Sequence, residues 1–419
     1  MAVCRFFHVY HSFVCRFLFS VLLIFFIHGA TAQTYFQFSS NTHRATIPFK
    51  FYRNLIIVPV IVNGHGPYNF VLDSGVGIST ITDPDLIGEL NLQLGKKITI
   101  RGLGDQQPAV AYLSSGIIVA MQSVQSFPFT MAVFEKDPFF LSTYLGIKVE
   151  GILGFEFFNS FSVKINYLNK TISLFPPGNY NPPGGYTAVP ITLQLNKPFI
   201  KAVCEINENQ NVPIDLLVDI GAGFPLSLEK KSDSRITVPA LHIETQLGMG
   251  LSGIIHGSLA RIQKLEIAGF KFKNIVTSFP DFGDWQNTSE TGDRNGSIGN
   301  FLLRRFTVVF DYQNSKLYLK PNSQYRAAFV YDRTGIELVG GGDDYSSFVV
   351  SNVKQNSPAS EAGIHEDDIV LEVNFQPVKN FDLGGIDHIL SDPGSKGVWL
   401  KLRRGEEDIY VLIKMRDLI

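Results

Sequence analysis

The sequence predicts a mainly β protein in which two similar β lobes are followed by a smaller third unit. The chain repeats itself once, at an offset of about 145 residues. Both copies consist mostly of short segments rich in β-branched and aromatic residues, which are typical of strands. The last ~90 residues carry their own strand and helix signals, enough for a small independent core. A length of 419 residues fits this division, since domains commonly have roughly 100 to 200 residues.

The composition is that of a globular protein without a strong charge preference. Hydrophobic residues make up 45% of the chain and charged residues 18%, which argues against a largely disordered chain. Lys and Arg total 36 against 38 for Asp and Glu, so no overall positive field attracts nucleic acid. We therefore expect no nucleic-acid partner.

Two landmarks keep the same spacing in both copies of the repeat. An apolar strand ends in the pattern Asp-x-Gly-x-Gly at residues 69–77 and again at residues 215–223. A second short motif ends in Gly154 in the first copy and in Gly299 in the other. The interval from Asp73 to Gly154 is 81 residues, and the interval from Asp219 to Gly299 is 80. Chance similarity between short β-rich strings would not keep this register, so we expect two lobes of similar build.

The elements of the two lobes follow from local patterns. Strands are predicted within Phe49–Val62, Lys97–Ile100 and Ala260–Val276. Hairpin turns are predicted at Asn169-Lys170 and Asn314-Ser315, which lie between apolar runs. Two clusters of proline and glycine bracket a polar stretch and indicate a linker. The predicted boundaries are residues 33–176 for the first lobe, 177–184 for the linker and 185–325 for the second lobe.

The third unit is predicted to span residues 330–419. A short helix should begin at Ser357-Pro358, with serine as the N-cap and proline in the first turn, and should stop at Gly363. A longer helix is predicted at Phe381–Leu390. The predicted strands of this unit are Phe348–Val353, Ile369–Asn374, Val398–Leu402 and Asp408–Lys414.

The N-terminus has the pattern of a secretory signal peptide. Arg5 and Arg16 precede the apolar run Phe17–Ile27, and a small-residue cleavage motif ends at Ala32. The charge-free run is shorter than the roughly 20 residues that a membrane-spanning helix needs, so an anchor is the weaker alternative. We expect residues 1–32 to be removed and the mature chain to be exported without membrane insertion.

The three cysteines do not form a disulfide framework. Cys4 and Cys15 would leave with the signal peptide, and only Cys204 would remain. We expect Cys204 to be a small buried hydrophobic residue and not a nucleophile.

Each lobe contributes one aspartate to the repeated motif, Asp73 and Asp219. Two carboxyl groups held close together cannot both ionise cheaply, so such a pair shares a proton. The ionised member can then activate a water while the other donates a proton to a substrate carbonyl. Gly75 and Gly221 leave room for close backbone approach and for main-chain N–H donors. The matched motifs favour a paired site over ordinary turns at strand ends.

These motifs resemble those of the pepsin/retropepsin-like aspartic proteases over residues 35–320. The resemblance rests on Asp73-Ser74-Gly75, Asp219-Ile220-Gly221-Ala222, Ile152-Leu153-Gly154 and Ser297-Ile298-Gly299. It implies an all-β bilobal fold, a catalytic dyad of Asp73 and Asp219 in a cleft between the lobes, and cleavage of an extended polypeptide substrate. The family usually has Thr or Ser after each aspartate, whose hydroxyl ties the two loops together. Ser74 fits this role, whereas Ile220 has no hydroxyl.

The same family covers its cleft with a mobile, glycine-containing hairpin. Gly102 and Gly104 are placed for such a flap in the first copy, and residues 248–253 correspond to them in the second. One flap would make the arrangement pepsin-like, and two would make it similar to a fused retropepsin dimer. The alternative is that both segments are exposed turns.

The C-terminal unit resembles a PDZ domain of the type associated with bacterial proteases. The resemblance rests on Asn356–Ile364, Asp368–Val370 and Val373-Asn374. PDZ domains bind extended peptides, often C-termini, by strand addition beside a carboxylate-binding loop. The implied peptide-binding residues are Gly335, Ile336, Glu337 and Leu338. Glu337 would oppose a terminal carboxylate, so capture of C-termini is left open.

Other chemistries are not indicated. The histidines at 242, 256, 365 and 388 lack metal-ligand spacing, and no nucleophile elbow, phosphate loop or dinucleotide fingerprint is present. We expect no cofactor and no metal.

The function expected from the sequence is that of a monomeric aspartic endopeptidase. It would be exported to a bacterial periplasm or to the outside, and its PDZ domain would dock substrate or regulate activity. The alternative, motivated by Ile220, is a non-catalytic peptide-binding or scaffolding protein that keeps the protease fold.

Overall fold

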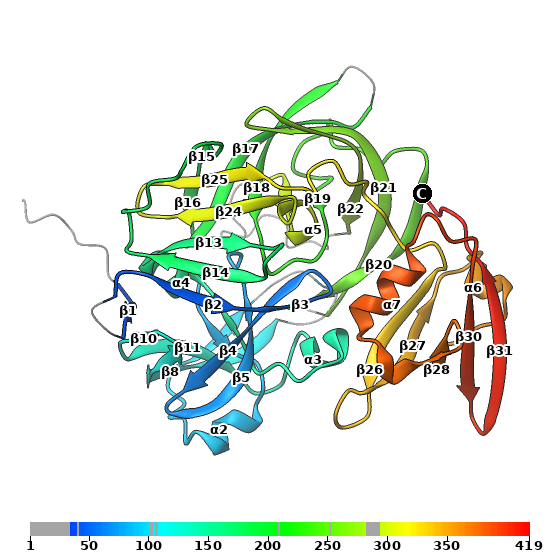
Figure 1. Ribbon diagram of the computed structural model, residues 1–419, viewed down its shortest axis with the longest axis horizontal. Coiled ribbons are helices and arrows are strands. Elements are labelled where there is room, and N and C mark those ends of the chain that lie inside the picture. Colours follow the sequence, from blue (N-terminus) through cyan, green and yellow to red (C-terminus); the bar gives the residue numbers. More distant parts are fainter. Residues whose placement is uncertain are drawn as a thin grey trace, which may run out of the picture. The chain divides into compact units, whose positions relative to one another are not determined.

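The computed structural model describes residues 34–39, 42–100, 104, 108–207, 210–251, 253–281 and 294–419. The predicted signal peptide at residues 1–32 and the predicted flap residue Gly102 lie outside these residues. The predicted mainly β fold class is confirmed, since strands form about half of the described chain and far more of it than helices do (Figure 1).

Lobe 1 is built on an eleven-stranded sheet. Its strands are β1 (Phe36–Phe38), β3 (Lys50–Tyr52), β4 (Leu55–Val62), β5 (His65–Leu72), β6 (Thr80–Ile81), β7 (Lys97–Ile100), β8 (Ala109–Ile117), β9 (Val119–Met121), β10 (Val124–Ser126), β11 (Phe129–Phe134) and β12 (Gly151–Leu153). Its helices are α2 (Asp85–Glu89), α3 (Leu141–Leu145) and α4 (Phe155–Ser160).

Lobe 2 is built on an eight-stranded sheet. Its strands are β16 (Thr192–Gln194), β17 (Lys197–Glu205), β18 (Asn211–Val218), β19 (Leu226–Leu228), β20 (His242–Gly250), β21 (Gly253–Ile267), β22 (Phe270–Pro280) and β23 (Gly296–Ile298), and its helix is α5 (Asn300–Leu303).

The same parallel strand pair in each lobe explains the matched spacing of the repeat. In lobe 1, β5 pairs in parallel with β12, and Leu72 lies opposite Leu153. In lobe 2, β18 pairs in parallel with β23, and Val218 lies opposite Ile298. The strand that carries the aspartate therefore runs beside the strand that carries the glycine motif, and both landmarks meet at one end of the pair.

A six-stranded sheet joins the two lobes, in the order β15-β25-β24-β13-β14-β2. Its strands are β2 (Ala45–Pro48), β13 (Ser162–Asn166), β14 (Thr171–Phe175), β15 (Thr187–Pro190), β24 (Phe306–Asp311) and β25 (Lys316–Pro321). The central pair is β13 with β24, in which Val163 lies opposite Phe310 and Ile165 opposite Val308. Corresponding strands of the two repeats thus pair with each other, and one continuous hydrophobic core runs through both lobes.

Several predicted turns are present, and one predicted strand is divided. Lys170 and Ser315, each with a φ of 51°, form the turns of the β13–β14 and β24–β25 hairpins. The segment Phe49–Val62, predicted as strand, turns at Arg53 and Asn54, whose φ values are 45° and 64°. Two successive residues with positive φ are typical of a tight hairpin turn, and asparagine tolerates that conformation.

The C-terminal unit has a sheet and a core of its own. Its strands are β26 (Ile336–Gly341), β27 (Ser347–Val353), β28 (Ile369–Val373), β29 (Gln376–Pro377), β30 (Gly397–Arg404) and β31 (Glu407–Lys414), and its helices are α6 (Pro358–Glu361), η1 (Val378–Asn380) and α7 (Leu383–Leu390). The predicted start of the short helix is confirmed, because the Ser357 hydroxyl accepts a hydrogen bond from the Ser360 amide.

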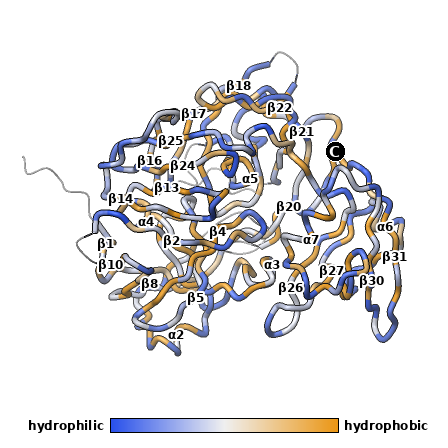
Figure 2. The backbone as a smooth tube through the Cα atoms, in the orientation of Figure 1, coloured by the Kyte–Doolittle hydropathy of each residue, from blue (hydrophilic) through white to orange (hydrophobic). Residues whose placement is uncertain are grey.

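Hydropathy follows this architecture. Apolar residues run through the strands of both lobes and of the C-terminal sheet, whereas the turn between β30 and β31 is hydrophilic (Figure 2). Among the described residues, no helix is long and apolar enough to cross a membrane.

Candidate active site

The two aspartates of the repeat stand at equivalent strand ends. The Asp73 amide donates to the Leu153 carbonyl at 2.9 Å, and the Asp219 amide donates to the Ile298 carbonyl at the same distance. Each carboxylate also accepts a hydrogen bond from the amide of the glycine two residues later. These bonds are 2.6 Å long from Gly75 to Asp73 and 2.9 Å long from Gly221 to Asp219. Strand pairing and a main-chain donor therefore fix both carboxyl groups.

Each glycine lies against the aspartate of the other lobe. A Cβ atom added to Gly75 would lie 2.9 Å from Cγ of Asp219, and one added to Gly221 would lie 2.1 Å from Cγ of Asp73. The two carboxyl groups lie within hydrogen-bond reach of each other. No side chain fits at either glycine position, which explains in physical terms why the motif needs glycine there.

The environment raises the pKa of both carboxyl groups. Burial and the adjacent Asp219 carboxylate raise the pKa of Asp73 well above its ordinary value. Burial also raises the pKa of Asp219, but the hydrogen bond from Asp73 and the positive charge of Arg294 act in the opposite direction. Two buried carboxyl groups this close together titrate as a unit and retain a proton more readily than separate carboxyl groups do.

Ser74 ties the two aspartate loops together. Its hydroxyl donates to the Val218 carbonyl at 2.6 Å and accepts a hydrogen bond from the Ile220 amide at 3.1 Å. Ser74 is buried, so these bonds are shielded from water. This is the contact that the sequence resemblance predicts for Ser74.

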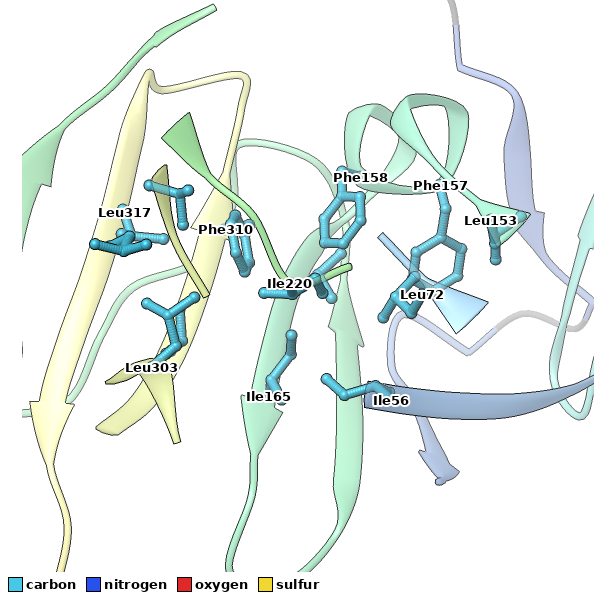
Figure 3. Close-up of a cluster of buried hydrophobic side chains, with 14 of the residues drawn as sticks. Ile56, Leu72, Leu153, Phe157, Phe158, Ile165, Ile220, Leu303, Phe310 and Leu317 are labelled. Carbon is cyan, nitrogen blue, oxygen red and sulfur yellow. The ribbon is translucent and has the colours of Figure 1, made fainter. Parts of the chain in front are cut away.

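The Ile220 side chain belongs to the apolar core and makes no such tie. Figure 3 shows it among buried side chains of both lobes, with Phe158 and Ile165 from lobe 1. The Ile220 main chain is instead held by Asn300, whose side-chain amide donates to the Ile220 carbonyl at 2.6 Å. The Asn300 side-chain oxygen accepts a hydrogen bond of 2.7 Å from the Tyr167 hydroxyl of lobe 1. A second link between the lobes therefore reaches the Asp219 loop.

This link was missed from the sequence, although a signal for it exists. Asn300 follows the glycine motif of the second copy at the position where the first copy has Phe155. Tyr312 corresponds to Tyr167, but its hydroxyl finds no hydrogen-bond partner among the described residues and its ring stacks on Phe155. Burial and the nearby Asp73 raise the pKa of Tyr312. The residue after the glycine motif is thus the polar Asn300 in the second copy and the apolar Phe155 in the first.

The second glycine of each motif contacts a hairpin turn of the opposite lobe. A Cβ atom on Gly223 would lie 2.8 Å from the carbonyl oxygen of Arg53, in the β3–β4 turn of lobe 1. A Cβ atom on Gly77 would lie 2.8 Å from the carbonyl oxygen of Leu195, in the β16–β17 turn of lobe 2. Each aspartate loop is therefore supported from across the lobe boundary.

A pair of antiparallel strands flanks each predicted flap segment. Strands β7 and β8 pair up to Ile100 and Ala109, and Gly104 lies between them with a φ of 135°. Strands β20 and β21 pair up to Gly250 and Gly253. Leu251, next to Gly250, packs on a lobe 1 cluster that includes Ile100. The structure therefore has a hairpin in each lobe, and Leu251 of the second hairpin packs on lobe 1 residues that include Ile100 of the first.

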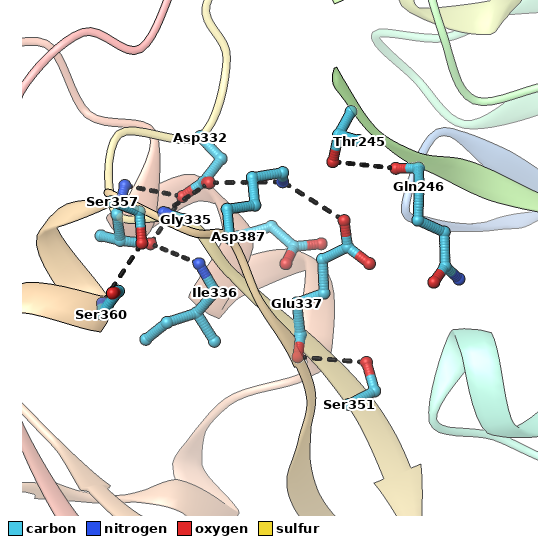
Figure 4. A network of polar contacts seen from close by, with 12 residues as sticks. Thr245, Gln246, Asp332, Gly335, Ile336, Glu337, Ser351, Ser357, Ser360 and Asp387 are labelled. Atoms are coloured by element: carbon cyan, nitrogen blue, oxygen red, sulfur yellow. Dashed lines mark hydrogen bonds and ion pairs between the residues drawn. The ribbon is translucent and has the colours of Figure 1, made fainter. Parts of the chain in front are cut away.

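The residues singled out in the C-terminal unit make mostly internal contacts. Ile336 and Leu338 point into the core of this unit. The Gly335 amide donates to the Asp332 carboxylate at 2.7 Å, and Glu337 forms an ion pair of 3.2 Å with Lys354 (Figure 4).

Cys204 is the one cysteine within the described residues. Cys204 is fully buried on β17, and burial raises the pKa of its thiol to about 11. Among the described residues, no group of three or more His, Cys, Asp or Glu side chains could hold a metal ion.

Comparisons with known protein families match two separate segments of the chain. Residues 58–157 match the family model described as aspartyl protease, and residues 331–401 match the one described as PDZ domain. The first lobe thus matches an aspartyl protease model, and the C-terminal unit matches a PDZ model and is called the PDZ domain.

The chain is also similar to periplasmic serine endoproteases named DegP. It is 28% identical over 181 residues to DegP of Salmonella typhimurium, which covers 42% of this chain and 36% of that protein. It is 26% identical over 183 residues to DegP of Escherichia coli K12, with the same two coverages. The chain thus matches about a third of the length of these relatives. A solved aspartic proteinase from Irpex lacteus aligns with a TM-score of 0.44 and 14% identity, over 68% of this chain and 99% of that one.

Proposed function

We propose that the protein is an aspartic-type endopeptidase in which Asp73 and Asp219 form the catalytic dyad. The reciprocal contact between the two motifs carries this proposal, because each motif glycine packs against the carboxyl group of the other lobe. That contact brings the two carboxyl groups together, and a carboxyl pair of this kind shares one proton.

We assign the shared proton to Asp73, because the adjacent Asp219 carboxylate adds to the effect of burial on its pKa. Asp219 takes a proton from a water whose oxygen attacks the carbonyl carbon of the scissile peptide bond, and Asp73 gives its proton to the carbonyl oxygen. The product is a neutral gem-diol without a covalent intermediate. Asp219 then returns the proton to the amide nitrogen, a gem-diol hydroxyl returns one to Asp73, and the carbon–nitrogen bond breaks. Activity should be lost at low pH when Asp219 is protonated, and at high pH when Asp73 ionises.

Single substitutions of the dyad test this proposal. Asp73→Asn and Asp219→Asn should each lower kcat for an unfolded protein substrate by about 10³-fold or more. Asp215→Asn is a matched control, because Asp215 lies four residues before Asp219 and pairs at the surface with Lys201. Retained cleavage in both dyad variants would refute the assignment.

A non-catalytic peptide-binding protein is the second candidate, because Ile220 departs from the hydroxyl residue expected there. The link through Asn300 weakens this candidate, since it holds the Asp219 loop by other means. Binding of extended peptides without pepstatin-sensitive cleavage between pH 3 and 8, a range of roughly five units that spans ordinary carboxyl pKa values, would favour it.

Export to a periplasm or to the outside is part of the proposal. The pattern at residues 1–32 supports it, and the similar DegP proteins are described as periplasmic. N-terminal sequencing of the protein from a cell fraction should find Gln33 as the first residue. A chain that keeps residues 1–32 in the cytoplasm would contradict export.

A further inference from the structure

The PDZ sheet ends in a strand that faces lobe 1. Within the described residues β26 pairs with β27 alone, so β26 is an edge strand, and α7 lies beside it. PDZ domains bind a peptide by adding it as a strand to such an edge, which requires the space next to the strand to be open. We call the space between β26 and α7 the PDZ groove.

Lobe 1 contacts both walls of the PDZ groove. Helix α3 of lobe 1 packs against β26 (Figure 1). A Cβ atom on Gly340 of β26 would lie 2.7 Å from Cα of Gly146, the residue that follows α3. A Cβ atom on Gly146 would lie 2.9 Å from Cδ1 of Leu383 on α7. Gly340 cannot carry a side chain while these surfaces touch, because its Cβ would meet the Gly146 backbone, so the contact is close and involves the backbone.

An ion pair closes the same contact. Nε of Arg53 lies 2.7 Å from one carboxylate oxygen of Asp387 on α7, and Nη2 lies 2.9 Å from the other. Nη1 donates to the Tyr144 carbonyl of α3 at 2.7 Å, and the guanidinium lies 4.9 Å from the centre of the Tyr144 ring. The Arg53 side chain is only 8% exposed, whereas the Asp387 side chain is 42% exposed, so the bidentate pair is shielded from water on the arginine side.

The loop at the other end of the groove is also occupied by the chain itself. The amides of Thr334 and Gly335 donate to the Asp332 carboxylate at 2.9 and 2.7 Å. Main-chain amides of such a loop are the donors that a peptide's terminal carboxylate uses in PDZ domains. Figure 4 shows the Asp332 carboxylate at this position, near Ile336 at the start of β26. The Asp332 carboxylate therefore occupies main-chain amides of this loop that the terminal carboxylate of a ligand would otherwise use.

Arg53 connects the contact with the PDZ domain to the candidate active site. Arg53, which binds Asp387 through its side chain, also supports Gly223 of the Asp219 loop through its carbonyl oxygen. The same turn residue thus contacts the PDZ helix and the dyad loop.

We propose that the PDZ groove is the docking surface for lobe 1, with Arg53 and residues 141–146 as its occupant, and that docking holds the Arg53 turn against the Asp219 loop. A peptide that adds to β26 must displace lobe 1, so peptide binding and the docked state exclude each other. The effect on catalysis rests on the proposed peptidase function, whereas the docking does not.

The docking is tested by hydrogen exchange in the full chain carrying Asp73→Asn, which needs no activity. Asp387→Asn removes the ion pair. Gly384→Leu places a side chain toward the Arg53 amide, since a Cβ at Gly384 already lies 3.5 Å from that nitrogen. Both variants should speed amide exchange in residues 141–146 by about tenfold. The control Asp408→Asn breaks an ion pair with Arg403 inside the PDZ hairpin and should change nothing there. Unchanged exchange in both test variants would overturn the docking.

The coupling is tested by kinetics in the chain with an intact dyad. Asp387→Asn should lower kcat for an unfolded protein substrate by about tenfold with little change in KM, because the dyad loop and not the substrate contact is loosened. Asp408→Asn should behave as the unsubstituted chain. Faster exchange with an unchanged kcat would overturn the coupling and leave the docking standing. An unsubstituted chain without any cleavage would refute the peptidase function, and the exchange result would still decide the docking.

Discussion

Asn300 supplies a polar tie to the Asp219 loop that the Ile220 side chain cannot make. Ser74 holds the Asp219 loop through its hydroxyl, and Ile220 cannot return the same bond. Asn300 and Tyr167 hold the Ile220 carbonyl instead, so the Asp219 loop has polar ties from both lobes. The Asp73 loop lacks the equivalent, because Phe155 takes the position of Asn300.

Replacing Asn300 should therefore affect turnover more than substrate binding. Asn300→Ala leaves two buried polar groups unpaired, which costs about 1–3 kcal/mol each in the free energy of unfolding. We expect kcat to fall by about 10- to 100-fold through misplacement of Asp219, with a smaller change in KM. Tyr167→Phe removes only the outer bond and should have a weaker effect of the same kind. An Asn300→Ala variant with an unaltered kcat would show that the link is purely structural.

The shared proton of the dyad should appear in the pH dependence of stability. The folded-state pKa of Asp73 is raised, so the folded chain binds a proton that the unfolded chain has already released. Stability is therefore lost as pH rises from the ordinary Asp pKa of about 4 through the raised value. Urea unfolding across this range should show Asp73→Asn gaining stability relative to the unsubstituted chain by up to about 1.4 kcal/mol per pH unit. Equal pH profiles for the two proteins would contradict the raised pKa.

At the scale of elements, the two hairpin turns that cross the lobe boundary have a common role. The β3–β4 turn supports the second motif and the β16–β17 turn supports the first, each through a carbonyl oxygen against a glycine. The sequence indicated the glycines but not the turns, since Phe49–Val62 has strand composition throughout. The division at Arg53 and Asn54 depends on the partner lobe, which stabilises the turn from outside the segment.

Alanine at either supporting position should weaken the pairing of the lobes. In Gly77→Ala and Gly223→Ala the new methyl group would lie 2.8 Å from a carbonyl oxygen, so the turn must move away. Each variant should lose about 1–3 kcal/mol in the free energy of unfolding, as overpacked sites do. Gly88→Ala is the control, because Gly88 lies in α2 with nothing within 4 Å of the added atom, and it should be neutral or slightly stabilising. Chemical denaturation measures all three, and a loss in the control equal to that at Gly77 would contradict the role of the turns.

At the scale of the whole molecule, the described chain contains one hydrophobic core that both lobes share and a separate core in the PDZ domain. The largest core includes residues of both lobes and is continuous across the β13–β24 pair. The core of the PDZ domain is separate and consists of its own strands and helices. The lobes should therefore unfold together, while the PDZ domain unfolds as a second cooperative unit.

Calorimetry of the full chain should resolve two unfolding transitions. Val308 and Val350 are both fully buried, the first in the sheet between the lobes and the second in the PDZ core. Val308→Ala should lower only the transition of the lobes and Val350→Ala only that of the PDZ domain, each by about 2 kcal/mol from the lost contacts and the cavity. A single transition shifted by both variants would show that docking through Arg53 merges the two units.

The sequence by itself determined the features that repeat or alternate along the chain. Strand composition, the division into two copies and the equal spacing after Asp73 and Asp219 are local or periodic, so they can be read without knowing which strands pair. The helix start at Ser357 is equally local, because a cap depends on a few neighbouring residues.

Only the tertiary structure decided which distant residues meet. Strand β13 pairs with β24 of the other lobe. The hydrogen bond from Tyr167 to Asn300 joins residues 133 positions apart, and the contact of Arg53 with Asp387 joins residues 334 positions apart. Each group could make the same kind of bond with many partners, and the choice depends on the packing of complete lobes and of the PDZ domain against them. Hydrogen bonds and ion pairs of this range leave no periodic trace in a sequence, because their partners are selected by the fold and not by spacing along the chain.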